Sequence, residues 1–553
     1  MASNNRQRLP VAGMTCIHCE TSVSKALQTV GAQDVEADFT RGEATFRLPE
    51  GVDPSVLDRA VRAAGYQPGH LESSSPTPIS SRRQGSTADF DFDLAVIGSG
   101  AAGFGAAIKA REQGARVIMV ERGTLGGTCV NIGCVPSKTL LRAAEAYHMA
   151  GHHPFRGIET HAGGVDLAQT VAQKNDLVTY LRQTKYGNLI GAYDWELVQG
   201  DAQFTGPDTL VVGDRIIRAA TFLVASGARP TVPPIPGLAT ASYQTSTEAL
   251  DLTHVPRSLV VIGAGYIALE LGQLFRFLGS EVTILQRGTQ LLPDYEPEVA
   301  EAVGAMLERK GIRVLTGTPV QRVERDNQGQ RLHVEINGVP EVLEAEHILV
   351  AAGRSPNIEG LNLSVAGIEI DERGAIVVDS QLRTTNPRVF AAGDVTLCPQ
   401  YVYVAAYQGG LAVDNALNDA NRPCDLTALP GVIFTAPQVA TVGFTGRQAR
   451  EAGYEVKTAV LPIEAVPRAQ VNYEDIGVFK LIADATTDRV LGAHIVADNA
   501  GDVIYAATLA VKHGLTVANL VESFAPYLTM AEGLKLGALA FDRDVSKLSC
   551  CAA

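Results

Sequence analysis

The sequence predicts an α/β protein of several domains, with a small βαββαβ module in front of it. Three observations lead to this prediction. A buried strand, a glycine-rich turn and an apolar helix follow one another twice, at 92–110 and at 259–278. Alternating strand and helix patterns fill residues 1–72. A polar stretch rich in Ser, Pro, Thr, Arg and Gln at 73–90 cannot bury a core, so we expect a flexible linker there.

The composition fits a globular protein and limits its partners. The chain has 553 residues, of which 46% are apolar and 19% charged. The formal net charge of −14 argues against nucleic acid as a partner. No apolar run is long enough to span a membrane, and the polar segment Met1–Arg8 leads into no signal-peptide core. We therefore expect a cytoplasmic protein with no membrane span.

The eight cysteines fall into three close pairs and two single residues. Positions 16/19, 129/134 and 550/551 form the pairs. In a reducing cytosol, paired cysteines are typical of metal binding or catalysis rather than of a disulfide framework. We expect the two single residues, Cys398 and Cys424, to be ordinary buried or surface thiols.

The first module carries a candidate metal site. Its predicted elements are a strand at Leu9–Val11, a helix at 23–30, strands at Val35–Phe39 and Glu43–Leu48, and a helix at Pro54–Ala64. This βαββαβ order predicts a ferredoxin-like fold. Cys16 and Cys19 lie two residues apart on a predicted loop, where two thiolates suit a soft ion of low coordination number. Redox motifs share this spacing, so a redox-active cysteine pair is the alternative. We expect His18, between the two cysteines, to face solvent.

The string Gly13-Met14-Thr15-Cys16-Ile17-His18-Cys19 in this order of elements is more specific than the spacing alone. It resembles the heavy-metal-associated domains of copper chaperones, metal-pumping ATPases and mercuric-ion carriers. The resemblance implies that Cys16 and Cys19 bind a heavy metal.

The first glycine-rich unit predicts a dinucleotide site. A strand at Phe92–Ile97 leads into spaced glycines that open the following helix, namely Gly98, Gly100 and Gly103. Glu121 ends the next predicted strand, close to the spacing of about 20 residues that this fingerprint requires. The pyrophosphate of a dinucleotide would lie on the helix N-terminus, and Glu121 would bind the ribose hydroxyls. We expect a dinucleotide in this first fold, and the family resemblance described below implies that it is FAD.

The second glycine-rich unit lacks the acidic residue that ends the second strand of the first unit. Leu259–Ile262 is a predicted strand, and Gly263 and Gly265 follow it before the helix. Where the first unit has Glu121, the second has Gln286 followed by Arg287. A carboxylate would repel a ribose 2′-phosphate, whereas Gln with Arg accommodates it, so we expect NADPH here. The alternative for Arg287 is a solvated surface charge.

Two further cysteines stand between these units, in the string Gly126–Lys138. Cys129 and Cys134 precede a predicted helix, and Pro136 fits its first turn. A helix N-terminus favours the thiolate form of a cysteine. The whole string resembles the redox-active pair of the flavin-dependent pyridine nucleotide-disulfide oxidoreductases, which include glutathione reductase, dihydrolipoamide dehydrogenase and the mercuric reductases. The alternative is a pair of buried structural cysteines.

This resemblance implies a set of cofactor contacts. Arg388–Asp394 resembles the second FAD segment of the family, with Asp394 at the ribityl chain. Lys138 and Glu270 resemble an ion pair beside the flavin ring, although an ordinary buried salt bridge is also open. The family's crossover strands between the two folds are resembled by two apolar runs that end in glycine, Thr221–Gly227 and His347–Gly353. The remaining residues that would line the FAD site are Gly123, Thr128, Lys138, Ala202 and Val402.

The C-terminal part departs from the disulfide reductases in one informative way. Those enzymes have a His five residues before a Glu, and here Tyr527 stands before Glu532. A tyrosine with a pKa near 10 is a poor base at neutral pH. The chain resembles the mercuric reductases at two tyrosines and two adjacent tail cysteines, namely Tyr527, Tyr186, Cys550 and Cys551. There the tail receives the ion and passes it to the inner cysteines across the dimer interface.

The sequence thus predicts two Rossmann-like dinucleotide-binding domains and an α+β dimer-interface domain behind a ferredoxin-like metal-binding module. The expected boundaries are a heavy-metal-associated domain at 1–72, a linker at 73–90, an FAD-binding domain at 91–238 and 356–425, an NADPH-binding domain at 239–355, and an interface domain with the tail at 426–553. The resemblance implies that NADPH and FAD reduce Hg²⁺ to elemental mercury in a homodimer, with small thiols and mercury carriers as donors. The alternatives are a disulfide reductase and a metal-transfer protein with an inactive flavoprotein body.

Overall fold

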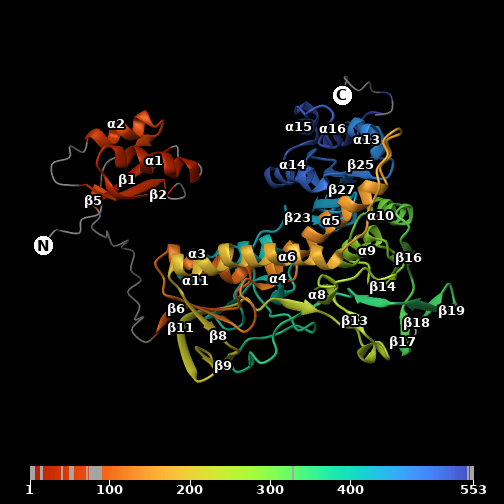
Figure 1. The fold of residues 1–553 in the computed structure, drawn as a ribbon, viewed down its shortest axis with the longest axis horizontal. Coiled ribbons are helices and arrows are strands. Elements are labelled where there is room, and N and C mark those ends of the chain that lie inside the picture. The colour runs from red at the N-terminus through yellow and green to blue at the C-terminus, as the bar shows by residue number, and fades with distance from the viewer. Residues whose placement is uncertain are drawn as a thin grey trace. The chain divides into compact units, whose positions relative to one another are not determined.

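The computed structural model describes residues 7–12, 17–38, 42–48, 55–69, 72–73, 90–326, 329–544 and 547. The chain divides into two compact units, residues 1–86 and 87–553, and each is described by itself (Figure 1). Cys16 and the two tail cysteines, Cys550 and Cys551, lie outside the described residues.

The first unit has the βαββαβ order that the sequence predicts. Its elements are β1 (Gln7–Ala12), α1 (Ile17–Thr29), β2 (Gln33–Asp38), β3 (Glu43–Arg47), α2 (Ser55–Ala63), β4 (Gln67–Pro68) and an added β5 (Glu72–Ser73). The antiparallel strand order β2-β3-β1-β4 is that of a ferredoxin-like fold. Leu57 and Val61, four residues apart on α2, reach a fully buried core that also contains Leu9, Leu27 and Phe46.

One prediction for this unit needs correction. The sequence placed both thiols of the metal motif on a loop, but α1 already begins at Ile17, so Cys19 lies in its first turn. The helix starts earlier than the apolar pattern shows, because its first turn carries polar residues that the pattern does not register.

The second unit begins with a seven-stranded sheet. Its strands are β6 (Phe92–Ile97), β7 (Val117–Glu121), β8 (Glu196–Gln199), β9 (Ala202–Gly206), β10 (Thr209–Val212), β11 (Arg215–Val224) and β22 (Val389–Ala391). The order is β8-β7-β6-β11-β10-β9, with β22 beside β11. Strands β8, β7, β6, β11 and β22 are parallel, and helices pack on β6, β7 and β22. Helices α3 (Ala101–Glu112) and α11 (Val402–Asn418) pack against each other there.

A helical segment follows β7 and carries the inner cysteines. It consists of α4 (Gly127–Asn131), α5 (Cys134–Gly151), α6 (Leu167–Arg182), a π-helical turn (Gln183–Gly187) and α7 (Asn188–Tyr193). The prediction of a helix start at this point is confirmed for Cys134, the first residue of α5, while Cys129 lies in α4.

A five-stranded parallel sheet forms the second dinucleotide fold. It has the order β13 (Tyr243–Gln244), β20 (His347–Val350), β14 (Ser258–Ile262), β15 (Glu281–Leu285) and β16 (Arg313–Leu315). Helices α8 (Ser246–Ala249), α9 (Tyr266–Leu278) and α10 (Pro297–Arg309) accompany it, with an antiparallel sheet of β17 (Val320–Asp326), β18 (Gly329–Ile336) and β19 (Val339–Ala345). The two-stranded ribbon of β12 (Ala228–Pro230) and β21 (Arg354–Pro356) is where the chain enters and leaves this fold.

An antiparallel sheet with helices forms the last part, at the blue end of the chain in Figure 1. Its strand order is β23 (Pro430–Ile433), β24 (Gln438–Gly443), β27 (Val490–Ala497), β26 (Val478–Asp484) and β25 (Val456–Pro462). Its helices are α12 (Gly446–Glu451), α13 (Pro467–Asn472), α14 (Ala500–His513), α15 (Val517–Glu522) and α16 (Glu532–Leu539). Every residue of β26 and β27 is buried, since α14 and α16 pack on this sheet.

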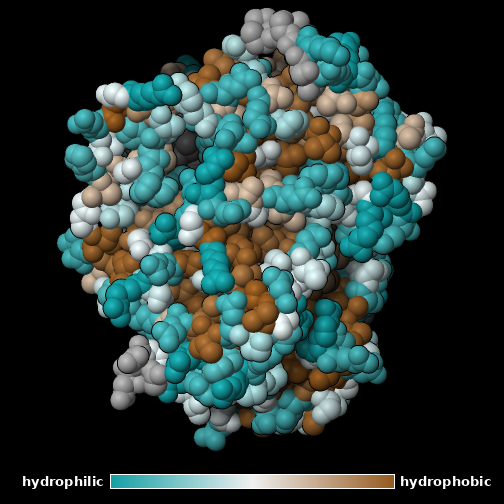
Figure 2. Space-filling view, turned by 90° about the vertical axis from the view of Figure 1, so that its right-hand side faces the viewer, coloured by the Kyte–Doolittle hydropathy of each residue, from teal (hydrophilic) through white to brown (hydrophobic). Residues whose placement is uncertain are grey.

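Three short 3₁₀ turns complete the described elements, at Leu238–Thr240, Gly393–Thr396 and Ile463–Ala465. Among the residues that the structure describes, no helix has the length and apolar character that crossing a membrane would need. The face in Figure 2 mixes hydrophilic and apolar side chains, as is usual for protein surfaces. The predicted fold class is confirmed.

Two adjacent glycines on α11 give a direct test of the packing between α3 and α11. A Cβ on Gly409 would lie 2.1 Å from the carbonyl oxygen of Ala102, whereas a Cβ on Gly410 would meet no atom within 4 Å. We predict that Gly409→Ala costs about 1–3 kcal/mol of stability through overpacking. The matched variant Gly410→Ala should be neutral or stabilising by up to ~1 kcal/mol, because Ala is the better helix former. Thermal unfolding of both variants checks this, and equal midpoints would contradict it.

Candidate active site

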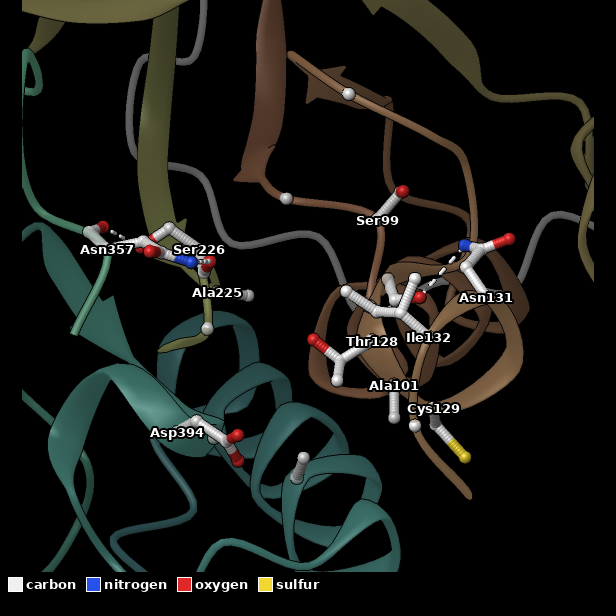
Figure 3. Close-up of a pocket in the computed structure, with 18 of the residues that line it drawn as sticks. Ser99, Ala101, Thr128, Cys129, Asn131, Ile132, Ala225, Ser226, Asn357 and Asp394 are labelled. Carbon is white, nitrogen blue, oxygen red and sulfur yellow. Dashed lines mark hydrogen bonds between the residues drawn. The ribbon is translucent and has the colours of Figure 1, made fainter. Parts of the chain in front are cut away.

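A cavity of ≈ 520 Å³ lies between the two dinucleotide folds. Figure 3 shows Ser99, Thr128 and Cys129 on one side of it and Ser226, Asn357 and Asp394 on the other. Most of the residues that the sequence assigned to FAD and to catalysis meet here. They are Gly98, Gly100, Glu121, Gly123, Thr128, Cys129, Cys134, Lys138, Ala202, Glu270, Asp394 and Val402.

The glycine-rich turn brings the backbone close to neighbouring chain segments. Gly98 has a φ of +106°, and a Cβ there would lie 2.4 Å from the carbonyl oxygen of Ala225. Gly103 does not line the cavity, but a Cβ on it would lie 2.0 Å from the carbonyl oxygen of Gly98. The third glycine therefore allows the helix to pack on the strand, which is the role that this fingerprint gives it.

Glu121 holds the loops around the cavity in place. Its Oε2 accepts hydrogen bonds from the backbone N–H (2.9 Å) and the hydroxyl (2.6 Å) of Ser99, and its Oε1 accepts from the N–H of Gly123 (2.6 Å). The Ser99 hydroxyl oxygen in turn accepts from the N–H of Gly126 (3.1 Å). Sequence reasoning missed Ser99, since only its fully buried contact with a strand 22 positions away reveals it.

The far wall of the cavity has an ion pair and two buried donors that lack a hydrogen-bond partner among the described residues. Burial raises the pKa of Asp394, and the charge of Arg354 opposes that shift. Arg354 Nε lies 3.7 Å from Asp394 Oδ2, beyond hydrogen-bond distance. Arg354 Nε and Gln400 Nε2 are both buried and have no hydrogen-bond partner among the described residues. Unpaired buried donors at a cavity wall fit a ligand rich in oxygen atoms, as FAD is.

The two inner cysteines differ in their affinity for protons. A hydrogen bond from Cys129 lowers the pKa of Cys134 to about 7, against the effect of burial, and the charge of Lys138 lowers it further. The same hydrogen bond raises the pKa of Cys129, as does burial. As the pH rises through about 7, Cys134 therefore becomes the thiolate of the pair while Cys129 stays protonated. The thiolate is the nucleophile and the metal ligand, so Cys134 is prepared for both roles.

Lys138 and Glu270 form the predicted ion pair. Lys138 Nζ lies 2.7 Å from Glu270 Oε2, and the Glu270 side chain is only 4% exposed. The second oxygen of Glu270 accepts a hydrogen bond from the backbone N–H of Phe434 (2.9 Å). Lys138 Nζ also lies 4.7 Å from the centre of the Phe434 ring, within cation–π range. Sequence reasoning missed Phe434, because this residue comes from a part of the chain far from both charged residues.

Of the two predicted active-site tyrosines, the structure brings one to the inner cysteines. Tyr186 lies in the π-helical turn, a feature frequent at functional sites, and its ring packs edge-on against Phe104 with ring centres 4.8 Å apart. Burial raises its pKa, and the neighbouring Cys129 and Cys134 raise it further. Its hydroxyl therefore keeps its proton at neutral pH.

Tyr527 does not line the cavity of its own chain. It lies between α15 and α16 and is 54% exposed, beside the fully exposed Phe524. Glu532 accepts a hydrogen bond from the backbone N–H of Leu528 (2.8 Å), which holds this loop.

The predicted NADPH residues lie at the carboxyl edge of the second sheet. Gly263 has a φ of +112°, and a Cβ there would lie 2.3 Å from the carbonyl oxygen of Ala351. Gly265 caps α9. Gln286 Nε2 donates to the carbonyl oxygen of Gln290 (3.3 Å). Arg287 is exposed and forms no ion pair with a residue that the structure describes, so its charge is available to a ligand.

The hydrogen bond between the inner cysteines predicts a specific pH dependence. In the reduced protein, alkylation of Cys134 should rise with pH through about 7, because only the thiolate reacts. Cys129→Ser keeps a hydrogen-bond donor and should retain this midpoint, whereas Cys129→Ala loses the donor and should shift it upward. Mass spectrometry of the Cys134 peptide after brief alkylation measures the shift. The same midpoint in the Ala variant and in the unmodified chain would contradict the proposed cause.

Three family models cover most of the chain. Residues 92–409 match the pyridine nucleotide-disulphide oxidoreductase family, 429–538 match its dimerisation domain, and 8–67 match the heavy-metal-associated domain. Among solved structures, the HOCl-induced flavoprotein disulfide reductase RclA from Escherichia coli is similar with a TM-score of 0.72. It is 30% identical in sequence, and the match covers 81% of this chain and 99% of that one.

Curated relatives match over the whole length. A mercuric reductase of Bacillus cereus is 55% identical over 99% of this chain and 87% of its own. A mercuric reductase of Staphylococcus aureus is 53% identical over 100% of both chains. The chain therefore belongs to the pyridine nucleotide-disulphide oxidoreductases and, within that family, to the mercuric reductases.

Proposed function

We propose that this chain reduces Hg²⁺ to elemental mercury with two electrons from NADPH, through FAD and the pair Cys129–Cys134. The overall reaction is Hg²⁺ + NADPH → Hg⁰ + NADP⁺ + H⁺. The observation that carries the proposal is the unequal thiol pair on the wall of a cavity that both dinucleotide folds share. Hg²⁺ is a soft ion that binds well to two thiolates, and the pair supplies two sulfur ligands.

The chain's own residues prepare the ion's binding. The Cys134 thiolate binds first, because its pKa of about 7 leaves a large share of it ionised at neutral pH, whereas Cys129 stays protonated. Coordination of the ion to Cys134 removes the negative charge that holds the proton on Cys129, so Cys129 can lose its proton and become the second ligand. The cation of Lys138 stays beside the pair, held by Glu270. The neutral Tyr186 hydroxyl supplies a polar contact close to the ion.

FAD, when bound, carries the electron pair from the nicotinamide to the thiol-bound ion. We assign the first fold to FAD, with Glu121 near the ribose and Asp394 near the ribityl chain. We assign the second fold to NADPH, with Gln286 and Arg287 at the 2′-phosphate. The unpaired exposed Arg287 supports this assignment. The domain boundaries expected from the sequence belong to the same proposal.

We further propose a homodimer whose subunits share each active site. The match to a dimerisation domain supports this, as do the exposed aromatic side chains of Phe524, Tyr527 and Tyr505 in that part of the chain. In such a dimer Tyr527 and the tail pair Cys550/Cys551 would reach the inner cysteines of the partner. The tail would take Hg²⁺ from small thiols or mercury carriers, and Cys16/Cys19 of the first module would be a further point of entry.

The two cysteine pairs should respond differently to the ligand that brings the ion. Cys129→Ala or Cys134→Ala should abolish Hg²⁺-dependent NADPH oxidation with every mercury donor, while bound FAD and its reduction by NADPH persist. The double variant Cys550→Ala/Cys551→Ala should lose on the order of 10²-fold with the bulky glutathione complex, because a tethered thiol acts at high effective concentration. It should lose much less with HgBr₂, whose small ligands let the ion reach the inner pair directly.

Steady-state NADPH oxidation with each donor makes this comparison, with Ser549→Ala as a control that alters the tail without removing a thiol. Equal losses with both donors in the tail variant would contradict the delivery role. Activity of the Cys134→Ala variant near the level of the unmodified chain would contradict the proposed function itself.

A further inference from the structure

Two histidines and a glutamate gather at the amino edge of the second dinucleotide sheet. His254 lies in the loop before β14, Glu346 comes directly before β20, and His347 is the first residue of β20. Strands β14 and β20 are parallel neighbours, with Leu259 opposite His347. The glycine turn that begins at Gly263 follows the carboxyl end of β14. This cluster therefore lies at the edge of the sheet opposite the nucleotide turn.

The three side chains are close enough to share one ion. Single ligand atoms of all three lie within 4.8 Å of one another. His254 Nε2 lies 3.9 Å from Glu346 Oε1, and the centres of the two imidazole rings are 5.5 Å apart. Two imidazole nitrogens with one carboxylate oxygen form a common Zn²⁺ ligand set, in which water takes the fourth position.

Other hydrogen bonds leave the ligand atoms available. Glu346 Oε2 accepts a hydrogen bond from the backbone N–H of Arg257 (2.9 Å) and lies 3.4 Å from Arg257 Nε, so Oε1 is the oxygen that faces His254. The backbone N–H of Glu346 donates to the hydroxyl of Ser258 (3.0 Å). His347 Nδ1 is buried and has no hydrogen-bond partner among the described residues. Such outer contacts orient metal ligands, and a buried nitrogen without a hydrogen-bond partner keeps its lone pair or its N–H free for a ligand.

We propose that His254, Glu346 and His347 form a Zn²⁺ site separate from the redox site. Nitrogen and oxygen ligands suit this ion of intermediate softness, whereas the thiol pairs prefer the softer Hg²⁺. The bound ion would join the loop before β14 to the start of β20 and so stabilise the second dinucleotide fold. It would take no part in electron transfer, because the nucleotide turn lies at the other edge of the sheet.

Co²⁺ is the probe that separates this site from the cysteine pairs. Bound to nitrogen and oxygen ligands, Co²⁺ gives visible d–d bands without the near-ultraviolet charge-transfer band of a thiolate complex. The experiment titrates the full-length FAD-loaded protein with Co²⁺ and then with Zn²⁺ as competitor. His254→Ala is the main variant, because this side chain is largely exposed and its loss should not disturb folding. Glu346→Gln tests the carboxylate.

His333→Ala is the matched control. His333 Nε2 lies 3.0 Å from Glu324 Oε2, so this residue is also a histidine paired with a carboxylate. Within the described part of the chain, it belongs to no group of three potential metal ligands. We expect one Zn²⁺-displaceable Co²⁺ complex without thiolate character in the unmodified chain and in the control. His254→Ala and Glu346→Gln should weaken it at least about tenfold, since even the loss of an outer contact commonly costs that much.

Two further readouts complete the test. Zn²⁺ should raise the thermal midpoint of the unmodified chain and of His333→Ala but not of His254→Ala. Hg²⁺-dependent NADPH oxidation should be the same in all of these proteins. The proposal is overturned if only thiolate-bound Co²⁺ appears, or if His254→Ala binds Zn²⁺ as tightly as the unmodified chain.

Discussion

One buried carboxylate, that of Glu270, joins the three parts of the catalytic unit. It projects from α9 of the second dinucleotide fold, pairs with Lys138 of the cysteine helix at 2.7 Å, and accepts a hydrogen bond from the backbone N–H of Phe434 beside the interface sheet at 2.9 Å. The Glu270 side chain is only 4% exposed, and a buried carboxylate is costly unless it is paired. Loss of either partner would therefore leave a buried charge only partly compensated. This contact and the packing of α5 on α9 together position the cysteine helix against the second nucleotide fold.

The chemistry of the inner cysteines depends on the same contact. Lys138 is available to stabilise the Cys134 thiolate because Glu270 holds it near the pair, and Cys129 adds the hydrogen bond that lowers the Cys134 pKa most. An ionised thiol beside a protonated one is an arrangement that can capture a thiophilic ion in two steps. In the proposed function, Tyr527 stands where the disulfide reductases have a general base, and this difference separates the present chain from them.

Local sequence patterns predicted most elements and the residues around the cavity, because strand periodicity, glycine spacing and the cysteine string are local signals. They missed what depends on contacts between distant segments. Examples are the hydrogen bonds from Ser99 to Glu121, the contact of Lys138 with the ring of Phe434, and the cluster of His254, Glu346 and His347. The early start of α1, which takes Cys19 off its predicted loop, was hidden by polar residues in the first turn. The roles given to single site residues remain predictions.

The measurement that tests this account most directly is the product balance of NADPH oxidation. Purified FAD-loaded protein is supplied with NADPH, excess small thiol and Hg²⁺, and mercury vapour is trapped from the headspace while NADPH is followed by absorbance. Parallel reactions replace Hg²⁺ with oxidised glutathione or lipoamide. The account predicts one Hg⁰ for each NADPH consumed and little turnover with either disulfide. Rapid turnover of a disulfide, or NADPH consumption without mercury vapour, would contradict it.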